Sequence, residues 1–408
     1  MSLLTQEKLF TAALGLDAPW SVVSVVFDAK RKQLDIYLDF PRGSRFLCPE
    51  CGDLCPVHDT MGRRWRHLSF FEHQTYLHAS VPRAKCPKCG VKMVNVKWAQ
   101  PGSGFTLLFE AMALLMVRDM PFLTASRLMH VSDDCLLRIA KRYVDQGRER
   151  DDMSDVTQIG IDETACASGH NYVTVVADVK NSRVLHVSKG HDIKALEASL
   201  SDLSNHGCKV KKIKSVCMDM SPSFISAVGK LMPKAQMIFD RFHVMKLVNN
   251  AVDTVRRNEV KTNDALKNTR YLWLKNPKKL TDAKREQLDS FLAQMNTQIA
   301  SAYQMKLNIQ ELWKLKTKKE ATSHLQAWLK WVEGATIDDA MKKLAKTIQS
   351  HKKGILNYFP SRLTSGFMES INSRIQAARA KAKGYRNPNN FITVIYLIAG
   401  KLNFQLPT

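Results

Sequence analysis

Three acidic side chains stand where a divalent metal ion could be bound. Asp162 closes the strand-like segment Ile-Gly-Ile-Asp, and alternation along a strand turns its carboxylate away from the face of the two isoleucines. Asp219 closes a second apolar segment that begins at Ile213, and the Ser-Pro pair that follows is typical of a helix start. Glu369 is the single acidic residue between positions 351 and 408, where nine lysines and arginines leave a local net charge of +8.

Three such carboxylates can hold two Mg²⁺ or Mn²⁺ ions. One ion activates water or a 3′-hydroxyl group, and the other stabilises the leaving oxygen of an in-line phosphoryl displacement. Helical periodicity between positions 365 and 379 separates two stripes. The apolar stripe holds Ile371, Ile375, Ala378 and Ala382, and the polar stripe holds Glu369, Asn372, Gln376 and Arg379. The glutamate therefore faces away from the core, as a ligand must.

Asp240 and His243 open the helix that follows the predicted strand Met237 to Phe239. Asp240 fits the N-cap of that helix. The two residues also share a helical face at i and i+3, so they could support the metal site as a pair. The second metal-binding acid could be Asp219 or Asp240, and we favour Asp219.

Two cysteine pairs predict a structural metal site. Cys48-Pro-Glu-Cys51-Gly and Cys86-Pro-Lys-Cys89-Gly are near copies of one knuckle, in which the glycine permits the tight turn behind two thiolates. Four thiolates form a closed tetrahedral site, so we expect structural Zn²⁺ on Cys48, Cys51, Cys86 and Cys89. An alternative set is Cys48, Cys51, Cys55 and His58.

The charge of the chain points to nucleic acid. The 408 residues carry 61 Lys and Arg against 38 Asp and Glu, a net charge of +23, and a polyphosphate rewards such an excess through counterion release. Between positions 41 and 100 there are ten basic and four acidic residues. In the hairpin that the zinc would hold, the residues suited to phosphate contacts are Arg63, Arg64 and Arg66, with Arg83 and Lys85.

A helix-turn-helix pattern follows the cysteine-rich segment. Two short helical patterns begin at Leu123 and Ser132, and Ser132 can cap the second. This arrangement alone is also common as a packing unit. The DNA contacts expected from the second helix are Ser132, Arg138, Lys141 and Arg142.

The order of elements predicts an α/β fold in several parts. We expect an N-terminal adaptor at 1–45, a zinc-binding ribbon at 46–100 and a helix-turn-helix domain at 101–150. Alternating strands and helices then predict a first α/β part at 151–254, an all-helical insertion at 255–355, and a closing helix with a basic C-terminus at 356–408. No apolar run is long enough to span a bilayer and no leader peptide is evident, so we expect a cytoplasmic protein.

The insertion holds four tryptophans, of which Trp328 and Trp331 share a helical face. Core packing is the first interpretation of both. The second is that one of them stacks on an unpaired base at a DNA end.

Taken together, these motifs resemble the ISL-three family of insertion-sequence transposases over residues 45 to 400. The match rests on the knuckles, the helix-turn-helix and, in order, Gly160-Ile-Asp162-Glu, Met218-Asp219-Met-Ser, Asp240-Arg-Phe-His243 and Glu369-Ser-Ile-Asn372. The resemblance implies an RNase H-like catalytic core with Asp162, Asp219 and Glu369 as its triad. It further implies that Asp240 and His243 form the Asp/Cys-x-x-His signature of transposases with a helical insertion.

The resemblance extends to a basic end that follows the glutamate, with Arg374, Arg379, Lys381, Lys383 and Arg386 as DNA contacts. One departure is Ser370, where the family often has glycine. The implied partners are double-stranded DNA, as terminal inverted repeats and as target, and a second copy of the chain, because two DNA ends must be joined.

Two rival functions use the same modules. A zinc-ribbon and helix-turn-helix regulator with an inactive transposase-derived core would bind DNA without cutting it, and it would not need all three carboxylates. An RNase H-like nuclease would cut without rejoining. We expect the active transposase.

Overall fold

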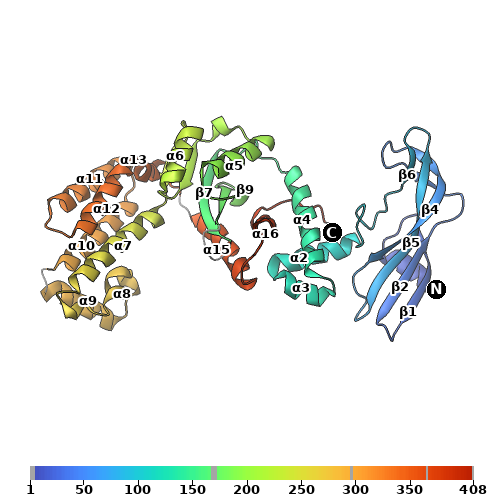
Figure 1. Cartoon of the computed structure of the whole chain (residues 1–408), viewed down its shortest axis with the longest axis horizontal. Helices are drawn as coiled ribbons and strands as arrows, with labels where there is room; N and C mark the ends of the chain where they lie inside the picture. The colour runs from blue at the N-terminus through green and yellow to red at the C-terminus, as the bar shows by residue number, and fades with distance from the viewer. Residues whose placement is uncertain (1–4, 167–171, 295–296, 364–365, 407–408) are drawn as a thin grey trace. The chain divides into compact units, whose positions relative to one another are not determined.

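A computed structural model of the chain describes residues 5–166, 172–294, 297–363 and 366–406. The chain divides into two compact units, Met1–Gln146 with Asn403–Thr408, and Gly147–Leu402 (Figure 1). In the parts of the chain that are described, no helix is long and apolar enough to cross a membrane.

A six-stranded sheet forms most of the first unit. Its strand order is β1-β2-β5-β4-β3, and β6 pairs with β5. Leu34, Ile36 and Leu38 alternate inward along β2 and are 1–3% exposed, as their spacing predicts. The elements are α1 (Gln6–Ala13), β1 (Ser21–Asp28), β2 (Gln33–Asp39), β3 (Arg45–Leu47), β4 (Leu54–Arg66), β5 (Gln74–Cys86) and β6 (Gly90–Met93).

Three helices complete the first unit: α2 (Leu107–Asp119), α3 (Phe122–Met129) and α4 (Asp133–Glu149). α3 ends at His130, whose φ of 54° is left-handed and turns the chain sharply. Ser132 then caps α4, since its Oγ accepts a hydrogen bond from the Cys135 N–H at 3.3 Å. The predicted helix-turn-helix is therefore present as α3, a short turn and α4.

The second unit is built on a five-stranded sheet of order β11-β10-β7-β8-β9. β8 runs antiparallel to both of its neighbours, whereas β10 and β11 run parallel to β7. This is the mixed topology of the RNase H-like core. The strands are β7 (Gln158–Ala165), β8 (Tyr172–Asp178), β9 (Arg183–Lys189), β10 (Ser215–Met218) and β11 (Gln236–Phe239).

Helices cover this sheet and close it. The central strands are buried along most of their length, as strands packed on both faces must be. α5 and α16 both contact β9, and α15 contacts β7. The helices are α5 (Ile193–Asn205), α6 (Pro222–Leu231), α15 (Gly366–Lys381) and α16 (Pro388–Ala399), with a 3₁₀ turn at Val210–Lys212.

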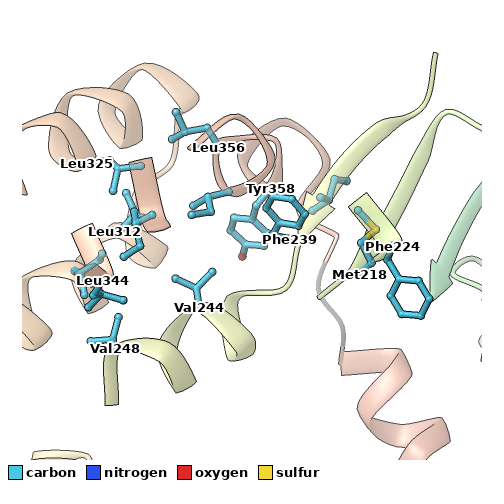
Figure 2. Close-up of a cluster of buried hydrophobic side chains, with 14 of the residues drawn as sticks. Met218, Phe224, Phe239, Val244, Val248, Leu312, Leu325, Leu344, Leu356 and Tyr358 are labelled. Atoms are coloured by element: carbon cyan, nitrogen blue, oxygen red, sulfur yellow. The ribbon is translucent and has the colours of Figure 1, made fainter. Parts of the chain in front are cut away.

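An all-helical insertion separates β11 from α15. Its helices are α7 (Arg241–Glu259), α8 (Arg270–Leu274), α9 (Asp282–Gln294), α10 (Gln298–Glu311), α11 (Lys318–Gly334), α12 (Asp339–Ser350), α13 (Lys352–Leu356) and α14 (Tyr358–Ser361). Three 3₁₀ turns, Asp264–Leu266, Pro277–Lys279 and Leu312–Lys314, join some of them. One hydrophobic cluster runs from the sheet into these helices. Figure 2 shows part of it, from Met218 and Phe224 to Leu325 and Leu344.

Candidate active site and metal centre

Strand register brings three acidic residues to one edge of the second sheet. Cys217 in β10 pairs with Gly160 in β7, and Met218 pairs with Phe239 in β11. Counting on from these pairs sets Asp162, Asp219 and Asp240 side by side. Asp219 and Asp240 directly follow β10 and β11, whereas Asp162 lies within β7, which continues to Ala165 instead of ending at the aspartate as the sequence predicted. The Asp240 N–H donates to the Met218 carbonyl at 3.1 Å, which holds Asp219 and Asp240 together. The carboxyl edge of parallel strands is where α/β sheets bind ligands.

Asp162 is partly buried and fixed through both of its oxygens. Its Oδ1 accepts from the Glu163 N–H at 2.8 Å, and its Oδ2 accepts from Asn372 Nδ2 at 2.6 Å. Burial raises the pKa of Asp162, and the charge of Asp219 adds to that rise, while these hydrogen bonds and His243 oppose it. A bound cation would offset both the burial of this carboxylate and its repulsion by Asp219.

Asp240 caps α7 and also binds a histidine. Its Oδ1 accepts from the Phe242 N–H at 3.0 Å, and its Oδ2 accepts from His243 Nδ1 at 2.8 Å. The N-cap that the sequence predicts is therefore present, and Asp240 and His243 form a hydrogen-bonded pair. The hydrogen bond to Asp240 raises the pKa of His243, and the charges of Asp240, Asp162 and Asp219 act in the same direction. The neighbouring acids therefore favour the protonated form of this imidazole.

The carboxylate of Asp219 accepts fewer hydrogen bonds than that of Asp240. Its Oδ1 accepts from the Ser221 N–H at 2.9 Å, which stabilises the turn into α6. No hydrogen bond from a described residue reaches its Oδ2, whereas Asp240 is only 4% exposed and has both oxygens occupied.

Helix α15 carries Glu369 and is fixed in register on β7. Met368 packs over Gly160, Asn372 bonds Asp162, and Gln376 donates to Thr164. These contacts recur every four residues of the helix and every two of the strand. Four helical residues rise about 6 Å and two strand residues about 6.6 Å, so the two elements stay matched.

Glu369 itself projects outward. It lies in the first turn of α15, it is exposed, and within the described chain its carboxylate makes no hydrogen bond or ion pair. Ile371 and Ile375 are buried, as the apolar stripe predicts. Ser365, where we expected the helix to begin, lies outside the described residues. In the residues that are described, Glu369 does not join Asp162 and Asp219 in a cluster of metal-ligand spacing.

The four knuckle cysteines do form such a cluster. The sulfur atoms of Cys48, Cys51, Cys86 and Cys89 all lie within 4.8 Å of one another, and those of Cys51 and Cys86 are 3.5 Å apart. A tetrahedral zinc with Zn–S bonds of about 2.3 Å separates its sulfurs by about 3.8 Å, so the donor set fits. The glycines behind the knuckles, Gly52 and Gly90, have φ of 75° and 78°, as the tight turns require.

The alternative ligand set of Cys48, Cys51, Cys55 and His58 does not form a cluster of metal-ligand spacing among the described residues. The thiol of Cys55 is buried and donates to the Asp53 carbonyl at 3.3 Å, and His58 is exposed. The structure thus brings together the four cysteines of the two matching knuckles.

The predicted DNA contacts of the ribbon differ in accessibility. Arg63 and Arg64 are exposed on β4, and Arg64 lies over the Tyr76 ring with 3.6 Å to its centroid. Arg66 is only 5% exposed, and its guanidinium donates to the carbonyls of His67 and Thr75 at 2.8 and 3.1 Å. Arg66 therefore holds the fold of the hairpin together.

The predicted DNA contacts of the helix-turn-helix also differ in accessibility. Arg138 and Lys141 are exposed on α4. Arg142 forms an ion pair with Glu110, which is fully buried and also accepts from the Tyr143 hydroxyl at 2.8 Å. The guanidinium of Arg142 is thus engaged inside the helical domain.

The basic residues after Glu369 surround a hollow of about 700 Å³. Among the described residues, no acidic side chain lines it. Arg374 and Lys381 are exposed on the same helix outside this hollow. The lining residues are Gln376, Arg379, Ala380, Ala382, Lys383, Gly384, Tyr385 and Arg386.

Trp328 and Trp331 of the insertion also differ in exposure. Trp328 is 1% exposed and its Nε1 donates to the Met305 carbonyl at 2.8 Å, so it belongs to the core. Trp331 is 42% exposed, and it alone of this pair could meet a ligand.

Asn372 is the site residue that sequence reasoning missed. The sequence places it on the polar stripe of the helix without indicating a role, although it stands three residues after Glu369 and therefore shares its helical face. That spacing was the available signal.

Comparison with known proteins agrees with this geometry. A transposase family model, for the DDE domain of family ISL3, matches residues 159–395, more than half of the chain. Models for the helix-turn-helix domain of transposase family ISL3 and for the zinc finger of transposases IS204/IS1001/IS1096/IS1165 match residues 94–144 and 44–97.

Two curated relatives match along nearly their whole length. The transposase for insertion sequence element IS1001 of Bordetella parapertussis is 26% identical over 376 residues, which cover 89% of this chain and 91% of that protein. The transposase for insertion sequence element IS1557 of Mycobacterium tuberculosis is 26% identical over 427 residues, covering 96% and 95%. With a zinc-ribbon region, a helix-turn-helix and an RNase H-like core in this order, the chain belongs to the ISL3 family of transposases.

Proposed function

We propose that this transposase binds the terminal inverted repeats of an insertion sequence and catalyses metal-dependent cleavage and transfer of DNA strands. The observation that carries the proposal is the in-register alignment of Asp162 and Asp219 on adjacent parallel strands, with the helix of Glu369 fixed on the first of them.

Asp162, Asp219 and Glu369 are the proposed ligands of Mg²⁺ or Mn²⁺. The donor set is all carboxylate oxygen, which these hard cations prefer. When bound, the ions activate the attacking oxygen and stabilise the leaving one. Asp219 is favoured over Asp240 because it keeps one oxygen without a hydrogen bond from the described chain, whereas both Asp240 oxygens bind within α7.

Asp240 and His243 are proposed to support the site. Asp240 orients the imidazole through Nδ1, and the charge on His243 partly offsets the repulsion between Asp162 and Asp219. This pair therefore lowers the cost of keeping two carboxylates ionised at one sheet edge.

Zn²⁺ is proposed as the ion of the four-cysteine cluster. Four sulfur donors select zinc over Mg²⁺ or Mn²⁺, and a site with four protein ligands leaves no position for substrate. The ion is therefore structural, and it holds the two knuckles that precede β4 and β6 against one another.

DNA contacts are proposed at three places. The exposed cations Arg63 and Arg64 suit backbone phosphates, and Arg138 and Lys141 suit the DNA contacts of a helix-turn-helix. The hollow lined by Arg379, Lys383 and Arg386 lies at the C-terminal end of the helix that carries Glu369, so it suits the strand that enters the active site. Strand transfer joins two ends, and we therefore propose a homodimer or larger assembly during the reaction.

The test is cleavage and joining of a labelled element end with Mg²⁺. Asp162→Asn, Asp219→Asn and Glu369→Gln should each abolish both steps and leave binding of the terminal repeat nearly intact, since the amides keep shape and lose charge. Glu333→Gln, an exposed carboxylate on α11, is the matched control and should behave as the parent.

The outcomes separate the candidate functions. Unchanged cleavage in one of the three variants removes that residue from the triad. A parent protein that binds the repeat and never cuts it supports a regulator with an inactive core. A parent that cuts and does not join supports a nuclease.

A further inference from the structure

The amide of Asn372 is held in one orientation beside the acidic edge. Its Nδ2 donates to Asp162 Oδ2 at 2.6 Å. The reverse orientation would set the amide oxygen against a carboxylate, where no proton is available to either atom. The carboxylate therefore fixes which end of the amide is nitrogen.

The other end of this amide lacks a partner. Asn372 Oδ1 is buried, and no hydrogen-bond donor in the described parts of the chain reaches it. A buried carbonyl oxygen without a partner is destabilising, and such atoms in native proteins call for an explanation. Gln376, one turn further along, shows the ordinary arrangement, in which the amide links helix to strand through Thr164 and remains exposed to solvent.

A cation satisfies an oxygen in this position. Asparagine carbonyls and carboxylates are the ligands that hard divalent cations take from proteins. The sheet edge already holds the three acids Asp162, Asp219 and Asp240. Asn372 adds an oxygen there without adding a fourth negative charge. It also follows Glu369 by three residues, so α15 could present two oxygens on one face.

We propose that Asn372 Oδ1 is a further ligand of the divalent cation bound by Asp162, while Nδ2 holds that carboxylate in place. This inference rests on the proposed function, because it takes the acidic edge to be a Mg²⁺ or Mn²⁺ site. Both ends of one amide would then serve the site.

The test measures Mn²⁺ affinity of the full zinc-loaded chain, by the electron paramagnetic resonance signal of free Mn²⁺, with no DNA present. Asn372→Ala should weaken Mn²⁺ binding by roughly tenfold or more, the range seen when groups that build a metal site are removed. Ser373→Ala, at an exposed position of the same helix, is the matched control and should bind within about twofold of the parent. Parent-like Mn²⁺ affinity in Asn372→Ala overturns the inference.

A second variant covers the case in which the alanine variant does not fold. Asn372→Asp restores an oxygen ligand and loses the donor to Asp162, so it should bind Mn²⁺ at least as tightly as the parent. Weaker binding than the parent in Asn372→Asp would show that only the donated hydrogen bond matters, and would also overturn the inference.

Variants of the acidic residues distinguish failure of the Asn372 inference from failure of the proposed function. If Asp162→Asn and Asp219→Asn lose Mn²⁺ while Asn372→Ala retains it, the metal site stands and Asn372 is only a packing residue. If both aspartate variants bind Mn²⁺ as the parent does, the proposed function itself fails.

Discussion

Gly160 is the position where a single methyl group should separate stability from activity. It lies in β7, two residues before Asp162, and a Cβ there would meet the Phe367 ring and come within 2.9 Å of Met368 Sδ. Ordinary contacts between heavy atoms are about 3.5–4.0 Å. Gly160→Ala must therefore push the start of α15 outward, and with it Glu369.

The expected loss of stability is small. Overpacking of this kind costs about 1–3 kcal/mol, and the start of α15 can yield because Phe367 is only partly buried. Replacing glycine inside a strand returns about 0.5–1 kcal/mol of backbone entropy. The net change in the free energy of unfolding should be about 1 kcal/mol.

The expected loss of rate is much larger. A misplacement of about 1 Å at a catalytic site can cost about 10²-fold, or roughly 2.7 kcal/mol in the transition state. We expect this loss in single-turnover cleavage of a pre-bound labelled element end at saturating Mg²⁺. Urea unfolding measures the stability of the same variant.

Gly229→Ala is the control. It lies in α6, where an added Cβ would meet only Met237 Cε, at an ordinary 3.5 Å, and helix propensity should stabilise it by up to about 1 kcal/mol. If Gly160→Ala cleaves at the parental rate, the register of α15 on β7 does not position Glu369, and the geometric argument is wrong.

The remaining predictions concern other parts of the chain. Trp328→Ala should cost about 3–5 kcal/mol of stability, and if Trp331→Ala impairs cleavage while melting like the parent, base stacking by Trp331 is supported, whereas full activity excludes it. Burial, with the charge of Arg66, lowers the pKa of His67 to about 4. Because that value lies below the unfolded 6.5, stability is present above pH 6.5 and falls by up to about 3 kcal/mol as the pH drops toward 4. His67→Gln should reduce this dependence of stability on pH in acid titrations followed by circular dichroism. An unchanged pH dependence would show that His67 is not its cause. Cys86→Ser should lose stoichiometric zinc in metal analysis together with specific repeat binding; retention of both would rule out the four-cysteine site.

Local pattern was enough to predict the elements that hold the candidate site. Strand alternation placed Asp162 on the face opposite its two isoleucines, and the strand-to-helix transition placed Asp219 at a sheet edge. The repeated knuckle predicted the four cysteines. In each case the information lies within a few neighbouring residues, where side-chain geometry is set by the backbone alone.

Contacts between distant segments were beyond that reach. Arg66 and Arg142 read as surface cations, yet one is tied to the carbonyls of its own hairpin and the other pairs with buried Glu110, 32 residues away. The link from Asn372 to Asp162 spans 210 residues. Such pairs depend on how elements pack, and no spacing rule along the chain predicts them.

The hydrophobic cluster that joins the sheet to the insertion decides how the catalytic unit can evolve. Phe239 at the end of β11 and Val244 in α7 belong to the same apolar body as Trp328 in α11. The insertion thus shares one continuous interior with the sheet. Its removal would strip the sheet of apolar cover beside the acidic edge, so descendants of this gene that shorten these helices should lose the folded RNase H-like core together with them. Length variation is expected to concentrate instead in the exposed turns between helices.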